Sequence, residues 1–176
     1  MYAPRMKGLC LRYVGDSEIA KDILQDGFIK VFSNIKQFKG IGSFDGWIKR
    51  IFVNTAISYI RKHEKKNKQV SFEDLDESKF LDTEIHHSDK QVDLKNENIN
   101  LVISADLSEL ELLSALQKIP EKFRSVFNLF CIENIKHEEI AEILDIDIAT
   151  SRTRLLRARS MIKQELYVIC REKLTN

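Results

Sequence analysis

An arginine-rich stretch near the C-terminus, HEEIAEILDIDIATSRTRLLRAR (residues 137–159), contains the side chains best suited to DNA recognition. Guanidinium groups donate paired hydrogen bonds to guanine edges, and an α-helix fits the major groove of duplex DNA. Ahead of the arginines, Ile140, Ala141, Ile143 and Leu144 recur at helical spacing. The pattern predicts a helix-turn-helix whose second helix presents its arginines to solvent.

Two aspartates define the turn of this motif. Asp145 stands where the chain needs a left-handed residue, which Asp tolerates better than most residues do. Asp147 is a good N-cap, because its carboxylate can accept backbone N–H bonds at the positive helix end. We expect a buried stripe of Ile148, Ser151, Leu155, Ala158 and Ile162, with Arg152, Thr153, Arg154, Leu156, Arg157 and Arg159 outside it. The alternative is a solvated basic helix in an ordinary bundle.

A second candidate surface lies in the first third of the chain, around the loop QFKGIGSF (residues 37–44). Its two glycines give the backbone conformational freedom. Aromatic rings in and beside a loop can stack on unstacked bases. The rings here are Phe38, Phe44 and Trp47. The alternative assigns all three rings to the hydrophobic core.

A long helix is predicted from about Phe44 to Lys66, and it places polar and basic residues beside this loop. Cations along a helix can follow the phosphates of a single strand. The stripe comprises Arg50, Asn54, Ile57 and Arg61, with Lys49, Lys62, Lys65 and Lys66 around it. Loop and stripe together suit single-stranded DNA, although the stripe alone is equally consistent with solvated surface.

Apolar residues elsewhere also recur with a helical period, and Gly and Pro are scarce, so the chain is predicted to be all-α. Two helices are expected before the loop, one at residues 2–14 and one from Asp16 or Ser17 to about Ile35. The second has a core face and a polar face that, taken alone, is typical of solvated surface. The core face comprises Ala20, Leu24, Gly27 and Val31, and the polar face Asp22, Gln25, Asp26 and Ile29.

The formal net charge of +1 hides an uneven distribution. Residues 1–70 carry 14 Lys/Arg against 6 Asp/Glu, whereas residues 71–111 carry 3 against 12. Low hydrophobicity and acidity indicate a flexible acidic linker at 67–106 between two small helical domains, 1–66 and 107–176. The linker is either a simple tether or a mimic of nucleic acid that occupies a basic channel on a partner.

Several classes of protein find no support. No run of about 18 apolar residues indicates a membrane span, and the first residues lack the apolar core of a signal peptide. Three scattered cysteines suggest reduced thiols in a cytoplasmic protein. We find no nucleophile–base pair, phosphate loop, carboxylate dyad or metal-ligand cluster, so no catalytic residue, metal or cofactor is predicted.

Three stretches in order resemble the extracytoplasmic-function (ECF) group of bacterial RNA polymerase sigma factors. They are GLCLRYVGDSEIAKDILQDGFIKVF, FKGIGSFDGWIKRIFVNTAISYIRK and IPEKFRSVFNLFCIENIKHEEIAEILDIDIATSRTRLLRAR. The resemblance covers residues 1–66 and roughly 107–168. It implies a dissociable polymerase subunit with a sigma region 2, a sigma region 4 and a linker directed toward the polymerase active site.

The resemblance also implies residue roles. Region 2 would bind the β′ clamp helices of core RNA polymerase through Asp22, Gln25 and Asp26. It would capture the melted −10 element through Phe38, Lys39, Gly40, Ser43, Phe44, Trp47, Arg50, Asn54 and Arg61. Region 4 would dock on the β flap and read the duplex −35 element through Thr150, Arg152, Thr153, Arg154, Leu156, Arg157 and Arg159. An anti-sigma factor is the implied regulatory partner.

The chain departs from the family pattern at three places. It opens at MYAPRM, inside what would be the first helix of region 2, so either the start codon is misassigned or the chain has lost a turn or more of that helix. Asp145 replaces the usual turn glycine, and Ser151 replaces a usual apolar residue. The competing hypotheses are a stand-alone helix-turn-helix regulator, which leaves the acidic patch and the glycine loop without a role, and an enzyme, which the residues favour least.

Overall fold

The structure is a computed structural model that describes residues 2–68 and 106–175. The described residues form helices connected by short turns, as predicted for an all-α chain. The predicted linker, 67–106, lies almost wholly outside them. The first block contains α1 (Tyr2–Val14), α2 (Ser17–Asn34), the short η1 (Ile35–Gln37) and α3 (Phe44–Lys68). The second contains α6 (Glu109–Gln117), α7 (Glu121–Phe127), the π-helical turn η4 (Asn128–Ile132), α8 (His137–Leu144) and α9 (Ile148–Thr175).

Local chemistry explains where several helices begin and end. Asp16 caps α2 by accepting the backbone N–H groups of Glu18 and Ile19 at 2.8 and 2.9 Å, and α2 begins at Ser17, one of the two predicted starts. Ser108 and Glu111 form a reciprocal capping box at the start of α6. Gly15, at φ +75°, lets the chain turn sharply between α1 and α2.

A close contact joins α2 to α3. A Cβ atom on Gly27 would lie 2.3 Å from Cε1 of Phe52, so only glycine allows this approach. Phe52 is fully buried, and its ring meets Phe28 edge-on with centroids 5.1 Å apart. This packing confirms the predicted core face of α2 at Gly27 and fixes α3 against it.

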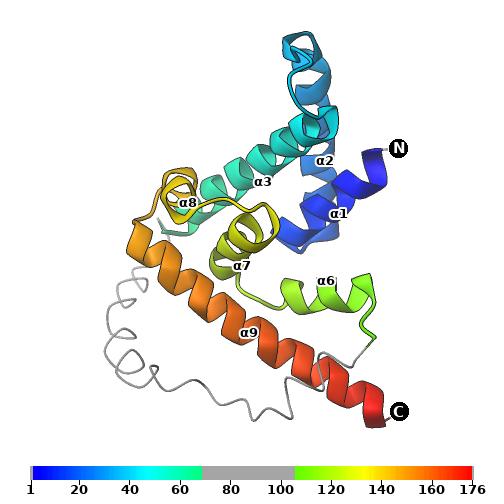
Figure 1. Cartoon of the computed structure of the whole chain (residues 1–176), viewed down its shortest axis with the longest axis vertical. Helices are drawn as coiled ribbons and strands as arrows, with labels where there is room; N and C mark the ends of the chain where they lie inside the picture. Colours follow the sequence, from blue (N-terminus) through cyan, green and yellow to red (C-terminus); the bar gives the residue numbers. More distant parts are fainter. Residues whose placement is uncertain (1, 69–105, 176) are drawn as a thin grey trace.

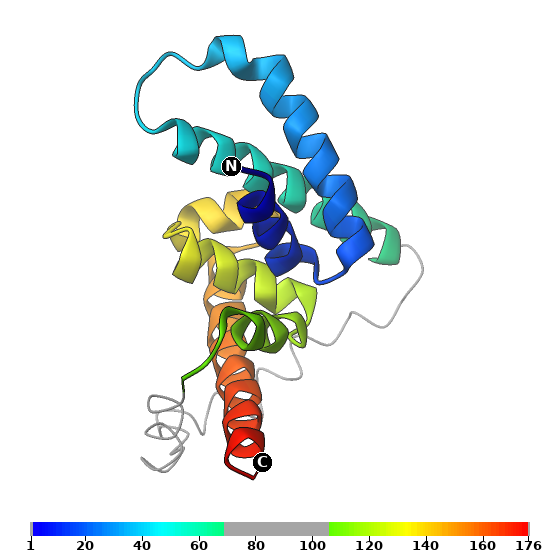
Figure 2. The same cartoon turned by 90° about the vertical axis from the view of Figure 1, so that its right-hand side faces the viewer.

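The two blocks share one hydrophobic core. Tyr13 and Phe52 of the first block lie in the same cluster of buried side chains as Val126, Leu129 and Ile140 of the second, and all five are inaccessible to solvent. Figures 1 and 2 show α7 and α8 between the helices of the first block and the long α9. The predicted helical blocks are therefore packed on each other.

Polar side chains cross the junction between the blocks. The buried guanidinium of Arg124 donates from Nε to the carbonyl of Tyr13 at 3.1 Å, and from Nη1 to those of Gln117 and Ile119. Asn128 donates to the carbonyl of Arg12 at 2.9 Å. The bonds to Tyr13 and Arg12 satisfy carbonyls in the last turn of α1, where the positive charge of Arg124 is also favourable. Burial lowers the pKa of Arg124.

Candidate nucleic-acid interface

The turn of the helix-turn-helix has the predicted geometry. Asp145 ends α8 in the left-handed conformation, at φ 57° and ψ 49°. Asp147 caps α9: its carboxylate accepts the backbone N–H of Thr150 at 2.7 Å and the Thr150 hydroxyl at 2.8 Å. These bonds, the backbone one foremost, hold the pKa of Asp147 below its usual range. Both predictions for the turn are confirmed.

The packing between α8 and α9 follows the predicted stripe at three of its five positions. Ser151, Leu155 and Ala158 are buried on α9, whereas Ile162 is only partly buried. Ile148, predicted to be buried with them, is 39% exposed, because it is the first residue of α9 and lies at the edge of the contact. The sequence did not predict that His137, which begins α8, pairs with Ser151 through Nδ1 and Oγ at 2.9 Å.

The His137 ring connects three elements. The His137 ring stacks on the Phe130 ring with centroids 4.5 Å apart. The guanidinium of Arg159 lies over the Phe130 ring, 5.8 Å from its centroid. Partial burial, followed by the charge of Arg152, lowers the pKa of His137. Through Ser151 and Phe130, the His137 ring connects the start of α8 to α9 and to η4.

The free face of α9 carries most of the predicted −35 contacts. Arg152, Leu156 and Arg159 are exposed, and Thr150, Thr153 and Arg157 are partly exposed. The placement of Arg154 on this face was wrong, since Arg154 is buried. It comes three residues after Ser151 and four before Ala158, which puts it on the buried side of the helix. Arg154 is therefore a packing residue of the second block.

The predicted acidic patch lies on an exposed face of α2. Asp22, Gln25 and Asp26 are all exposed. The patch continues along the helix into two large apolar side chains, Ile29 at 62% and Phe32 at 70% exposure. The predicted polar face of α2 includes Ile29 but not Phe32, although Phe32 follows Ile29 by three residues. A contiguous acidic and apolar surface of this kind is typical of a protein-binding site.

The aromatic residues at the loop form a cluster on the surface of the first block. Ring centroids are 5.1 Å apart for Phe38 and Phe44, 5.6 Å for Phe38 and Trp47, and 5.7 Å for Phe44 and Trp47. All three side chains are only partly buried. Their burial lies between the two predicted alternatives, a fully buried core and a surface that binds bases. The loop between Phe38 and Phe44 has left-handed glycines at positions 40 and 42. Its apolar tip, Ile41, is 83% exposed and was not predicted.

The polar stripe on α3 is only partly exposed. Arg50 and Asn54 face solvent, and Arg61 is about half-buried and lies 3.8 Å from the carboxylate of Asp145. The prediction for Ile57 was wrong: its side chain is buried. Ile57 lies on the stripe between Asn54 and Arg61, and it belongs to the hydrophobic core that the two blocks share.

A crevice of about 330 Å³ separates this part of α3 from the second block. Arg50 and Asn54 line one wall, and Glu139 and Ile143 of α8 line the other. At one end the carboxylate of Glu133 pairs with Lys49 at 2.8 Å. Cationic and amide side chains from the first block thus face carboxylates from the second.

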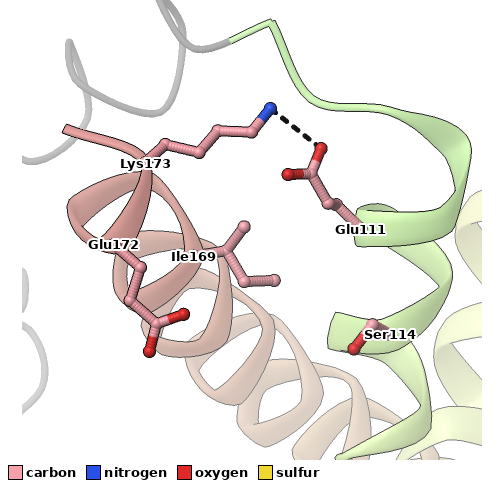
Figure 3. Close-up of a pocket in the computed structure, with 5 residues that line it drawn as sticks. All are labelled: Glu111, Ser114, Ile169, Glu172 and Lys173. Atoms are coloured by element: carbon pink, nitrogen blue, oxygen red, sulfur yellow. Dashed lines mark ion pairs between the residues drawn. The ribbon is translucent and has the colours of Figure 1, made fainter. Parts of the chain in front are cut away.

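A second hollow lies between α6 and the C-terminal part of α9 (Figure 3). Glu111 and Lys173 pair across it at 2.9 Å, and Ser114, Ile169 and Glu172 line the rest. The backbone N–H of Ser108, followed by Lys173, lowers the pKa of Glu111 to about 2. This hollow joins two helix ends, far from the predicted nucleic-acid contacts.

Residues 2–68 and 106–175 lack two further kinds of feature. No group of three His, Cys, Asp or Glu side chains in these ranges is arranged to hold a metal ion. Among the same residues, no helix is both long and apolar enough to cross a membrane.

Comparisons with known proteins agree with this geometry. Residues 1–66 match the model of sigma-70 region 2, and residues 109–162 match that of sigma-70 region 4. An ECF RNA polymerase sigma-E factor of Haemophilus influenzae is 32% identical over 167 residues, covering 94% of this chain and 83% of the relative. The RNA polymerase sigma-H factor of Pseudomonas aeruginosa is 29% identical over 173 residues, covering 97% and 85%.

A solved structure has the same fold. The sigma factor RpoE, in a co-crystal with the anti-sigma factor NepR from Bartonella quintana, aligns over 94% of this chain and 92% of that chain, with a TM-score of 0.52 and 18% identity. The fold, the two matched regions in order and the identity to the Haemophilus relative agree. The chain belongs to the ECF group of RNA polymerase sigma factors of the sigma-70 family.

Proposed function

We propose that this chain is a dissociable subunit of bacterial RNA polymerase that directs core enzyme to specific promoters and promotes DNA melting. The observation that carries the proposal is the presence, in one chain, of a helix-turn-helix with an exposed arginine face and of a polar helix beside an aromatic loop. The first suits duplex DNA, and the second suits a melted strand. A stand-alone duplex-binding regulator needs only the first.

In this proposal the free face of α9 reads the −35 element in the major groove. Arg152, Arg157 and Arg159 supply donors for guanine edges and phosphates, and the exposed Leu156 supplies an apolar contact for a thymine methyl group. Thr150 and Thr153 flank this face. Arg154 is not part of it, because its side chain is buried.

The −10 element is assigned to the loop and to the start of α3. A flipped base costs a few kcal/mol of stacking, and a pocket that receives it offsets that cost. The loop and its aromatic cluster provide Phe38, Lys39, Gly40, Ser43, Phe44 and Trp47. Arg50, Asn54 and Arg61 follow along α3 as contacts for the melted strand.

Core polymerase is assigned to the exposed surface of α2, through Asp22, Gln25 and Asp26 for the β′ clamp helices. Ile29 and Phe32 extend this surface with the apolar area that a stable interface requires. Region 4 is assigned the β flap. The proposal places the protein in the cytoplasm with the polymerase, leaves all catalysis to the polymerase, and includes an anti-sigma factor as regulator.

The test is run-off transcription with purified bacterial core polymerase on fragments of the source genome, with and without the chain. Specific initiation that depends on the chain supports the proposal. Binding of the chain alone to a specific duplex, with no initiation, would replace it with a stand-alone regulator. An Asp22→Lys and Gln25→Ala double variant should lose core polymerase in a pull-down, and unchanged capture would remove the assignment of the α2 surface.

The −35 assignment has a matched control on the same helix. Arg157→Ala should weaken promoter use mainly at one −35 position, by about 1–3 kcal/mol of discrimination if the guanidinium pairs with a guanine. Lys163→Ala removes an exposed cation of α9 beyond the helix-turn-helix and should leave that preference intact. Equal loss on all −35 sequences would assign Arg157 to phosphate instead.

A further inference from the structure

One carboxylate interrupts the surface assigned to the melted strand. Asp45, in the first turn of α3, is the only acidic residue between Ile35 and His63, a stretch that contains both the loop and the polar stripe. A carboxylate among contacts for phosphates opposes their binding unless a cation neutralises it. Its charge is favourable at a helix N-terminus, which is the simplest alternative account of Asp45.

Two side chains of α1 bind this carboxylate. Arg5 donates from Nη1 to Oδ2 of Asp45 at 2.8 Å. Hydrogen bonding from Tyr2, followed by that from Arg5, holds the pKa of Asp45 below its usual range. Tyr2 and Arg5 are three residues apart, so they lie on one face of α1. Stabilisation of α3 by an N-terminal charge requires neither of these partners.

The same face of α1 contacts the aromatic cluster of the loop. The ring of Tyr2 meets the ring of Phe44 edge-on, with centroids 6.1 Å apart and planes at 85°. Phe44 in turn packs on Phe38 and Trp47. The N-terminal end of α1 lies near the start of α3 in both overall views (Figures 1 and 2). Tyr2 therefore interacts with the ring that ends the loop and with the carboxylate that follows it.

The loop has little packing of its own around its glycines. A Cβ atom on Gly40 or Gly42 would meet no heavy atom within 4 Å beyond its chain neighbours, and Ile41 between them is 83% exposed. The position of the loop therefore depends on its ends. At the end that leads into α3, the residues that α1 contacts are Phe44 and Asp45.

We propose that Tyr2 and Arg5 are positioning residues for capture of the melted strand: through Phe44 and Asp45 they hold the aromatic cluster in the arrangement that receives an unstacked base. The inference rests on the proposed function for its assignment of the loop to single-stranded DNA. Neither Tyr2 nor Arg5 contacts the strand in this arrangement. Arg5 also neutralises Asp45, so that phosphates can approach the start of α3.

Two double variants separate these contacts from the fold as a whole. Tyr2→Ala with Arg5→Ala removes the edge-on ring and the hydrogen bonds to Asp45, whereas Tyr2→Phe with Arg5→Lys keeps the ring and the charge and should recover most of the loss. The midpoint of thermal unfolding should fall little in either, because an exposed ion pair contributes little to stability. Lys7→Ala is the matched control: it removes an exposed cation of α1 two residues from Arg5, on a different side of the helix.

Trp47 is the only tryptophan of the chain, so its fluorescence reports directly on the aromatic cluster. Acrylamide should quench Trp47 more strongly in the Tyr2→Ala, Arg5→Ala variant than in the parent, because rings that are no longer held expose more of the indole to solvent. The Lys7→Ala variant should match the parent. Unchanged quenching in the double-alanine variant would overturn the proposal.

Strand binding is measured on the chain assembled with core polymerase, from the anisotropy of fluorescein-labelled dT20, with core polymerase alone as background. When only the held arrangement of the cluster binds, affinity falls with the fraction of chains in that arrangement, so the double-alanine variant should bind dT20 about tenfold more weakly. Affinity for a duplex of the same length should stay unchanged. A parent chain that adds no dT20 binding to core polymerase would refute the strand site itself, and with it the proposal.

An Asp45→Ala background distinguishes positioning from direct contact. The carboxylate that Arg5 binds is absent there, so adding Arg5→Ala should weaken dT20 binding no further. An equal loss in both backgrounds would mean that Arg5 contacts phosphate itself, and would overturn the positioning role. Greater quenching of Trp47 without weaker dT20 binding would also overturn it, and would count against the assignment of the loop. Failure of run-off transcription with the Trp47 and dT20 results as expected would refute only the proposed function.

Discussion

Substitution of Gly27 by alanine sets two physical effects of opposite sign against each other. Gly27 lies inside α2, where a helix normally gains from alanine. An added Cβ would meet three atoms of the Phe52 ring, at 2.3, 2.6 and 2.7 Å. Phe52 is fully buried and packed edge-on against Phe28, so the ring has no free space to enter.

Magnitudes decide the sign. Helix propensity alone would stabilise the alanine variant by about 1 kcal/mol. Overpacking a dense core costs about 1–3 kcal/mol and occasionally more. Because the contacts are far shorter than the roughly 3.5–4.0 Å optimum for carbon atoms, we expect the upper part of that range. The net loss in free energy of unfolding should be about 2 kcal/mol.

Gly8 is the matched control for this prediction. It lies inside α1, and a Cβ there would have no non-local heavy atom within 4 Å. Gly8→Ala should therefore show the propensity effect alone, a gain of about 0.5–1 kcal/mol. The two substitutions are chemically identical and differ only in what surrounds the new methyl group.

Thermal and urea unfolding, followed by far-ultraviolet circular dichroism, measure both variants. At about 2–4 °C per kcal/mol for a chain of this size, their midpoints should differ by roughly 5–10 °C, with Gly8→Ala above the parent and Gly27→Ala below it. A Phe52→Leu exchange added to Gly27→Ala should recover part of the overpacking cost. A Gly27→Ala variant as stable as the parent would refute the close approach of α2 and α3.

Other predictions concern the second block and its junction with the first. Leu129→Ala, at a fully buried site in the shared core, should lower the free energy of unfolding by about 2–5 kcal/mol. Calorimetry should show both blocks unfolding in one transition at a lower midpoint. Two separate transitions in the parent would contradict a shared core. Ionised Glu111 stabilises the fold above its unfolded pKa near 4.5, and this contribution is lost as the pH falls toward its folded pKa of about 2. Glu111→Gln should therefore reduce the pH dependence of the free energy of unfolding between these values. An unchanged pH dependence would remove the role of its capping bonds. Asp147→Ala should lower both the unfolding midpoint and −35 duplex affinity, whereas Asp147→Asn, which retains an acceptor for the Thr150 N–H, should preserve them; equal loss in both variants would argue against the cap.

Features that depend on local chemistry could be predicted from the sequence. The start of α2 at Asp16 or Ser17, the left-handed turn at Asp145 and the cap at Asp147 each involve residues within a few positions of one another. The helix predicted at residues 2–14 also follows from a local pattern, and its predicted bounds match α1. The burial of Arg154 was also within reach, because its spacing from Ser151 and Ala158 places it on the packed side.

Features that depend on contacts between distant segments could not be predicted in this way. Ile57 lies at a helical spacing that groups it with Asn54 and Arg61, yet it is buried in the core that the two blocks share. The partners of Glu133 at positions 12 and 49 are 121 and 84 residues away in the sequence. A period along one helix indicates which residues share a face, and the partner that covers that face is a property of the fold.

Asp145 contributes both to its local turn and to the contact between the two blocks. Its left-handed backbone closes the turn of the helix-turn-helix, a task that glycine performs with less strain. Its carboxylate approaches Arg61 of the other block, a task that glycine cannot perform. Compared with glycine, aspartate at this position makes the turn less stable but places a negative charge near α3. If the side chain of Asp145 stabilised mainly its own turn, Asp145→Gly would destabilise the second block. Because its carboxylate instead approaches Arg61 of the first block, we expect Asp145→Gly to preserve or raise the stability of the second block and to weaken its contact with α3.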